Sequence, residues 1–156
     1  MLSCTMIASM LLFLSIFIVQ KKNKKQKAFT AILPSSVLTY VKLLRSTSSV
    51  FIAFHPECEH CQYEAKSINK RQKELQNTNI VFFTSASDSL TNVFSHTYGL
   101  DTIKNVQVIS DKNDEMHQLF DVKTIPSIFI YNKDGQLVKQ YKGETKIDAI
   151  LKAIAP

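Results

Sequence analysis

The most informative stretch of this sequence is Phe51-Ile52-Ala53-Phe54-His55-Pro56-Glu57-Cys58-Glu59-His60-Cys61. Its apolar start predicts a buried strand, and the turn that follows predicts a helix beginning at the two cysteines. Cysteines three positions apart on a first helical turn lie close enough to form a disulfide. A helix N-terminus favours negative charge, which suits a thiolate, the nucleophile of disulfide exchange. We therefore expect redox chemistry at Cys58 and Cys61.

Upstream of this stretch, residues 2–19 carry no charge and are dominated by leucine, isoleucine, methionine and phenylalanine. As a helix they would span about 27 Å, close to the thickness of a bilayer core. We expect residues 1–20 to be a transmembrane anchor, with a cleaved signal segment as the main alternative. Residues 21–33 read as a lysine-rich linker, and residues 34–156 as one folded domain.

The net charge of +6 comes mainly from five lysines in this linker, namely Lys21, Lys22, Lys24, Lys25 and Lys27. Without them, 14 basic and 13 acidic residues remain, so the folded part is nearly neutral. This distribution argues against a nucleic-acid surface and favours contact with anionic lipid head groups. The positive-inside rule would place the domain that follows these lysines in the cytoplasm.

The apolar periodicity of residues 34–156 predicts alternating helices and strands. We expect helices at 34–44, 58–75, 88–98, 111–120 and 145–154, and strands at 50–54, 80–83, 106–109, 127–131 and 136–142. In the helix at 88–98, Asp88 is the expected cap, and the helix carries the apolar residues Leu90, Val93, Phe94 and Tyr98. In the last helix, Thr145 is the expected cap. This order predicts an α/β fold whose mixed central sheet has helices on both faces.

Two further motifs accompany the C-x-x-C pair: Thr124-Ile125-Pro126 before a strand, and Asp134-Gly135 in a hairpin turn. Together, these features resemble the thioredoxin superfamily over residues 34–156. The extra helix and strand between the cysteines and Pro126, and the Cys58-Glu59 pair, are similar to membrane-tethered TlpA/ResA-type proteins. That resemblance implies a thioredoxin-like fold and an extracytoplasmic protein that reduces disulfides in partner proteins.

The same resemblance implies roles for individual residues. Cys58 would be the attacking thiolate, Cys61 the resolving thiol and Pro126 a cis-proline beside the sulfurs. The backbone at Ile125, next to Thr124, would bind an extended substrate segment by strand addition. No metal or bound cofactor is expected beyond a redox-active Cys58–Cys61 disulfide. The expected partners are protein disulfides and a separate thiol electron donor, and we expect the domain to be a monomer.

Some residues depart from the family pattern. Glu57 stands where a tryptophan is usual, and Ile52 where many members carry a buried acid. Glu57, Glu59 and Glu64 are candidates to replace that acid, and the sequence does not choose among them. His60 would stabilise a Cys58 thiolate, whereas Glu57 and Glu59 would oppose it, so the direction of electron flow stays open.

Two other functions can be weighed from the same residues. Thiolates beside an imidazole suit Cu(I), so a tethered copper metallochaperone using Cys58, Cys61 and His60 is the alternative. A peroxidase is disfavoured, because peroxiredoxins carry a P-x-x-x-[ST]-x-x-C pattern around their reactive cysteine. Here Pro56 is only two residues before Cys58, and no serine or threonine lies between Pro56 and Cys61. From the resemblance we expect the periplasmic side of a bacterial membrane, although the positive-inside rule keeps the cytoplasmic side open.

Overall fold

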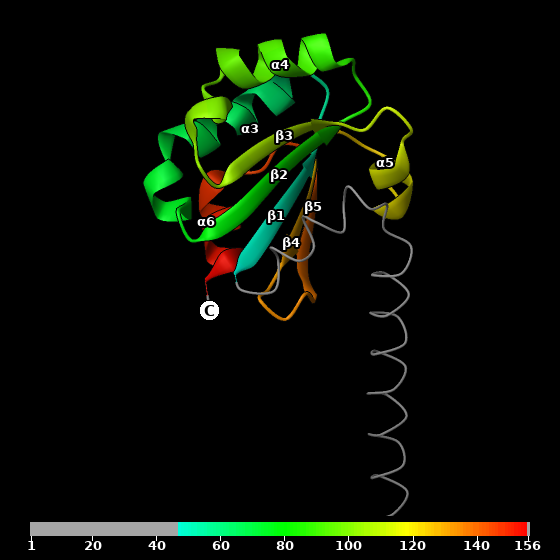
Figure 1. Ribbon diagram of the computed structural model, residues 1–156. Coiled ribbons are helices and arrows are strands. Elements are labelled where there is room, and N and C mark those ends of the chain that lie inside the picture. Colours follow the sequence, from blue (N-terminus) through cyan, green and yellow to red (C-terminus); the bar gives the residue numbers. More distant parts are fainter. Residues whose placement is uncertain (1–46, 156) are drawn as a thin grey trace, which may run out of the picture. The chain divides into compact units, whose positions relative to one another are not determined.

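The computed structural model of this chain describes residues 47–155, which contain a five-stranded sheet (Figure 1). Its strands run in the order β3-β2-β1-β4-β5. β1, β2 and β3 are mutually parallel, whereas β4 is antiparallel to β1 and β5 is antiparallel to β4. The strand bounds are β1 Ser48–Ala53, β2 Thr78–Thr84, β3 Val106–Ser110, β4 Ser127–Tyr131 and β5 Leu137–Lys142. The mixed sheet predicted from the sequence is therefore confirmed.

Helices fill the connections between these strands, as their apolar periodicity predicts. They are α3 Glu59–Lys70, α4 Asp88–Thr97, α5 Glu115–Leu119 and α6 Ile147–Ile154, with 3-10 turns at Gln72–Leu75 and Leu100–Thr102. Within residues 47–155, no helix combines the length and apolar character needed to cross a membrane. The predicted membrane anchor, the lysine-rich linker and the helix at 34–44 lie outside the described residues.

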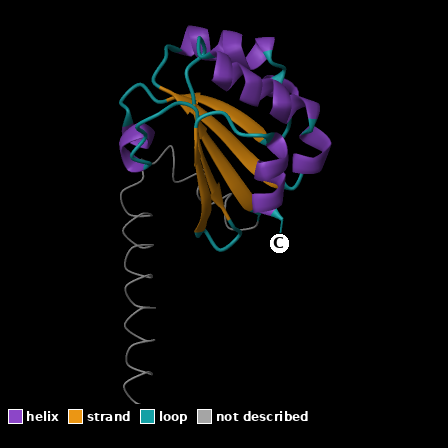
Figure 2. Ribbon diagram, turned by 180° about the vertical axis from the view of Figure 1, so that it is seen from behind, coloured by secondary structure: helices purple, strands orange, loops and turns teal. Residues whose placement is uncertain are grey.

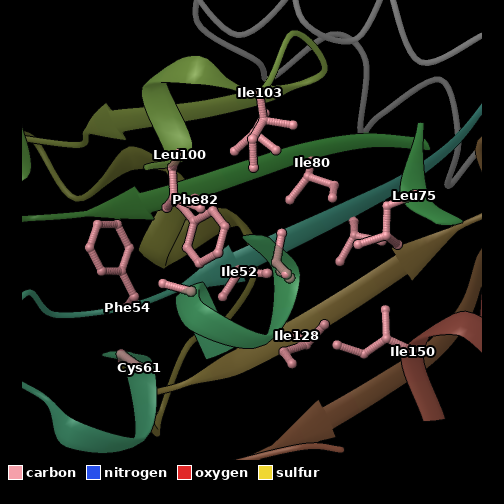
Figure 3. Close-up of a cluster of buried hydrophobic side chains, with 14 of the residues drawn as sticks. Ile52, Phe54, Cys61, Leu75, Ile80, Phe82, Leu100, Ile103, Ile128 and Ile150 are labelled. Carbon is pink, nitrogen blue, oxygen red and sulfur yellow. The ribbon is translucent and has the colours of Figure 1, made fainter. Parts of the chain in front are cut away.

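The main core covers one face of the sheet. Alternate strand residues point to the same face, and Ile52, Phe82 and Ile128 belong to one buried cluster with α3, α4 and α6. Figure 3 shows this cluster, with Cys61 at the end opposite Leu75 and Ile150.

The other face carries a second, aromatic cluster. Phe51 and Phe83 are the strand neighbours of Ile52 and Phe82, and both stack against Phe120 just after α5, with ring centroids 5.0 and 5.3 Å apart. Figures 1 and 2 show α5 on the opposite side of the sheet from α3, α4 and α6. Helices thus cover both faces.

The apolar residues of α4 do not all face the sheet, and two expected helix caps were wrong. Leu90 and Val93 are 43% and 60% exposed, because α4 packs against the sheet through Phe94. Its cap is Ser87 rather than Asp88: the Ser87 hydroxyl accepts a hydrogen bond from the Leu90 N–H. The last helix begins after Lys146, which frees Thr145 for a contact with the functional site.

Candidate active site

Three segments that are distant in sequence meet at one edge of the sheet. Ala53, at the end of β1, pairs with Ser127, at the start of β4, and Ser127 also pairs with Lys142, at the end of β5. The residues just beyond these strand ends therefore lie together: 54–61, 124–126 and 143–145. The Gly143 N–H donates to the Pro126 carbonyl at 2.8 Å, which ties the second and third segments together.

Cys58 occupies the N-cap position of α3, with extended backbone. Its N–H donates to the His55 carbonyl at 3.1 Å, and the Gln62 amide donates to the Pro56 carbonyl at 3.0 Å, so the turn before the helix is held in place. The side chain is half-buried and its thiol is free. A thiolate here would face the positive end of the helix dipole and remain within reach of a substrate.

Cys61 is fully buried and also a free thiol. Burial raises the pKa of Cys61, and a hydrogen bond to the Cys58 side chain raises it further. Cys61 therefore stays protonated while Cys58 is exposed enough to react. This asymmetry is what a resolving thiol requires.

Glu64 lies one helical turn beyond Cys61 and is completely buried. One carboxylate oxygen accepts a hydrogen bond from the Thr145 N–H at 2.5 Å, and the other has no hydrogen-bond partner among the described residues. Burial raises the pKa of Glu64 to about 7, and the Thr145 hydrogen bond offsets part of that rise. Its charge also raises the pKa of Cys61, so the two groups lie within electrostatic reach. Of the three acids left open by the sequence, only Glu64 is buried here.

The other two acids and His60 lie at the surface. Glu57 and Glu59 are exposed. The ring nitrogen Nδ1 of His60 lies 2.7 Å from a carboxylate oxygen of Glu144, on the loop after β5. Nothing in the sequence suggested Glu144, because 84 positions separate it from His60.

The Ile125–Pro126 peptide bond is cis, and Ile125 is 37% exposed. The Ser127 hydroxyl donates to the Thr124 carbonyl at 2.6 Å, which fixes the start of this loop. An exposed apolar side chain at this edge of the sheet is suited to contact with a protein segment, and substrate binding by residues 124–126 stays a prediction.

The copper alternative would use His60 as a third ligand beside the two sulfurs. Among residues 47–155, the only three ligand-bearing side chains whose atoms cluster within 4.8 Å are Asp111, Asp114 and His117. His60 therefore does not cluster with the two sulfurs. The Asp111 carboxylate already accepts hydrogen bonds from the Met116 and His117 N–H groups at 3.0 Å and pairs with the His117 ring, so it stabilises the start of α5.

Comparisons with known proteins show the family and the fold of this chain. The sequence profile of the AhpC/TSA family matches residues 25–140. No curated protein matches the chain. A secreted Mycobacterium tuberculosis disulfide oxidoreductase homologous to Escherichia coli DsbE has a similar structure, with a TM-score of 0.63 at 18% identity, covering 72% of this chain and 84% of that one.

Two other structures have the same fold. StoA from Bacillus subtilis gives a TM-score of 0.58 at 14% identity, over 71% of this chain and 84% of its own. Peroxiredoxin Q from Xanthomonas campestris gives 0.60 at 19% identity, over 72% and 80%. The thioredoxin-like fold predicted from the motifs is confirmed. With the profile matching most of its length, this chain belongs to the AhpC/TSA family of thioredoxin-like thiol oxidoreductases.

Proposed function

We propose that this chain is a membrane-anchored thiol–disulfide oxidoreductase that reduces disulfides in partner proteins. The observation that carries the proposal is the pairing of a half-buried Cys58 with a fully buried Cys61 at the start of α3. Such a pair separates the attacking sulfur from the resolving sulfur. The exposed Ile125, at the same edge of the sheet, supports docking of an extended protein segment rather than a small thiol.

The reaction proceeds in two exchanges. The Cys58 thiolate attacks one sulfur of a substrate disulfide, and the other substrate sulfur leaves as a thiolate and takes up a proton. Cys61 then loses its proton and attacks the Cys58 sulfur. This step forms the Cys58–Cys61 disulfide and releases the second substrate thiol. The substrate gains two electrons and two protons, and a separate dithiol donor restores the enzyme.

Glu64 supplies the base for the second exchange. The buried Cys61 thiol must be deprotonated before it can attack, and water is excluded from it. A carboxyl group with a pKa of about 7 is half-ionised at neutral pH, where it can take up and return a proton. This role replaces the acid that Ile52 cannot provide.

The cellular setting of the proposal rests on the resemblance and the N-terminal composition. Residues 2–19 anchor the chain, the five linker lysines contact anionic lipid, and the domain faces the periplasmic side of a bacterial membrane as a monomer. Periplasmic proteins form disulfides, so substrates for a reductase are available there.

The first experiment is a redox titration of the full chain in mild detergent, carrying Cys4→Ser so that only the C-x-x-C thiols are counted. The protein is equilibrated in glutathione or dithiothreitol buffers, alkylated, and analysed by mass spectrometry. A reduction potential of about −250 mV or below indicates a reductase, and a potential of about −120 mV indicates an oxidant. Stoichiometric Cu(I) binding without any reversible disulfide would overturn the proposal in favour of a metallochaperone.

A trapping experiment assigns the two cysteines. Cys61→Ser is expected to accumulate a mixed disulfide with a disulfide-bonded protein substrate such as insulin, because the second exchange is blocked. The matched variant Cys58→Ser should form none. Equal trapping by both variants would contradict the assigned order of attack.

Peroxide reduction is the second candidate, and the family profile and the peroxiredoxin Q similarity favour it. In that reaction the Cys58 thiolate would attack a peroxide oxygen, releasing an alcohol or water and leaving a sulfenic acid. Cys61 would then condense with it, releasing water and forming the disulfide. Residues 56–61 contain no hydroxyl side chain, which argues against this function. Consumption of hydrogen peroxide by the reduced chain, compared with Cys58→Ser, separates the two candidates.

A further inference from the structure

The loop between β5 and α6 contacts the redox site through three consecutive residues. The Gly143 N–H donates to the Pro126 carbonyl at 2.8 Å, the Glu144 carboxylate pairs with His60 at 2.7 Å, and the Thr145 N–H donates to the buried Glu64 carboxylate. One short segment thus contacts Pro126, the His60 residue between the cysteines, and the buried Glu64.

The backbone holds Glu144 in place for this pairing. Gly143 follows directly after Lys142, which pairs with Ser127 in the sheet, and Gly143 has a positive φ of 85° that turns the chain. Thr145 is anchored to an acid with no exposed surface. Because both neighbours of Glu144 are held in place, the pairing of its carboxylate with the His60 ring does not require a flexible loop to become ordered.

This pairing decides what the His60 ring can do for the cysteines. An imidazolium near a thiolate stabilises it, and with it the reduced form of the pair. Here one ring nitrogen is paired with the Glu144 carboxylate, which would offset the charge of an imidazolium, and the ring does not form a ligand cluster with the two sulfurs. The Glu144 charge also raises the pKa of Glu64, so Glu144 acts on both sides of the C-x-x-C pair. Glu57 and Glu59 are the other charged groups beside the ring along the chain.

We propose that Glu144 is a positioning residue that holds the His60 ring on its own carboxylate and so keeps the Cys58–Cys61 pair more reducing than the histidine alone would make it. This inference rests on the proposed function of the pair. It explains how a chain with histidine between its cysteines can still serve as a reductase.

Removing the Glu144 charge should therefore favour the dithiol. In Glu144→Gln, the His60 ring is free to approach Cys58 and no carboxylate offsets its charge. Both changes act in the same direction. Because His60 is 68% and Glu144 43% exposed, solvent weakens the pair, and we expect the equilibrium constant with glutathione to shift about two- to five-fold toward the dithiol.

The test is the glutathione equilibrium constant of the full chain in mild detergent, with Cys4→Ser in every variant. Glu144→Gln, His60→Asn and the double variant form a cycle, measured at pH 7 in low and in about 1 M salt. The shift caused by Glu144→Gln should fall below 1.5-fold in the His60→Asn background and at high salt. His60→Asn alone should shift the equilibrium toward the disulfide, because the carboxylate remains.

Asp148→Asn is the matched control. Asp148 is an exposed carboxylate on α6 that pairs with Arg71 at 3.1 Å, at the other end of α3, about 20 Å along the helix from Cys58. It should leave the equilibrium constant unchanged. The inference would be overturned if Glu144→Gln shifts the equilibrium constant by less than 1.5-fold. It would also be overturned if the shift has the same size with and without His60. If the parent chain forms no reversible disulfide, the proposed function fails as well. If the parent chain forms a reversible disulfide but Glu144→Gln leaves its equilibrium constant unchanged, only this inference fails.

Discussion

At the scale of single residues, the site depends on an acid buried without full compensation. Glu64 has one hydrogen bond from the Thr145 N–H and one oxygen without a partner in the described part of the chain. An ionised carboxylate in this position is costly, because burial removes its hydration. Buried acids of this kind are retained where their proton is used, which is the role proposed here.

The free-energy cost of ionising the buried Glu64 predicts how the stability of the chain depends on pH. The pKa of Glu64 rises from its ordinary value of 4.5 to about 7 on folding, so between these values the folded chain binds more protons than the unfolded chain. Stability therefore falls as the pH rises from about 4.5 to 7, by on the order of 3 kcal/mol. Glu64→Gln keeps an oxygen for the Thr145 N–H and cannot ionise. Its free energy of unfolding, from denaturant titrations, should equal that of the parent at pH 4.5 and exceed it at pH 8.

The exposed Glu59 on the same helix offers a matched control, Glu59→Gln. The same Glu64→Gln variant should also accumulate mixed disulfide at pH 7, because Cys61 loses its base. A Glu64→Gln chain whose stability runs parallel to the parent from pH 4.5 to 8 would contradict the assigned ionisation. Normal turnover in that variant would contradict the assigned base.

At the scale of elements, the end of α4 is locked against the end of α3. Gly99 follows α4 with a positive φ of 63°, a conformation that strains any side chain. A Cβ there would lie 2.6 Å from the Asn69 amide nitrogen, which donates to the Tyr98 carbonyl at 2.6 Å. The tight approach of these two helix ends therefore depends on glycine.

Two alanine variants separate the effects of strain and contact. Gly99→Ala should destabilise the chain by about 2 kcal/mol, because it adds backbone strain and displaces Asn69. Gly143→Ala is also strained, with a φ of 85°, but a Cβ there meets nothing within 4 Å, so its cost should be about 1 kcal/mol. Thermal and denaturant unfolding measure both. Equal losses would mean that the Asn69 contact is relieved without cost.

At the scale of the whole molecule, the sheet gathers residues from widely separated parts of the sequence at one edge, which forms the candidate site. The ends of β1, β4 and β5 bring the cysteines, Pro126 and Glu144 together. The half-buried Cys58 at this edge is open to reagents as well as substrates. This accessibility makes the orientation of the whole chain measurable.

We expect a membrane-impermeant maleimide to label Cys58 in intact bacterial cells that express the Cys4→Ser chain, after mild reduction. The reason is the proposed periplasmic position of the domain. Cys58→Ser provides the background signal, and lysed cells provide the total. Labelling that appears only after lysis would place the domain in the cytoplasm, as the positive-inside rule favours.

Much of the fold followed from local patterns in the sequence. Strands β1, β2 and β4 are short runs of apolar residues, and Gly99 and Asp134-Gly135 mark the ends of elements, so their positions were predictable. The C-x-x-C pair and the Thr124-Ile125-Pro126 motif predicted the candidate site for the same reason, since each carries its own signal along the chain. The fate of Leu90 and Val93 was not predictable, because the side of α4 that faces the sheet depends on packing with Phe94.

By itself, the sequence determined the two sulfurs, the proline beside them and the strand–helix order that presents them. Only the tertiary structure decided the electrostatics of the site. It buried Glu64 and left Glu57 and Glu59 in solvent, and it placed Glu144 against His60. Desolvation and pairing depend on what surrounds a charge in space, and spacing along the chain does not specify those neighbours.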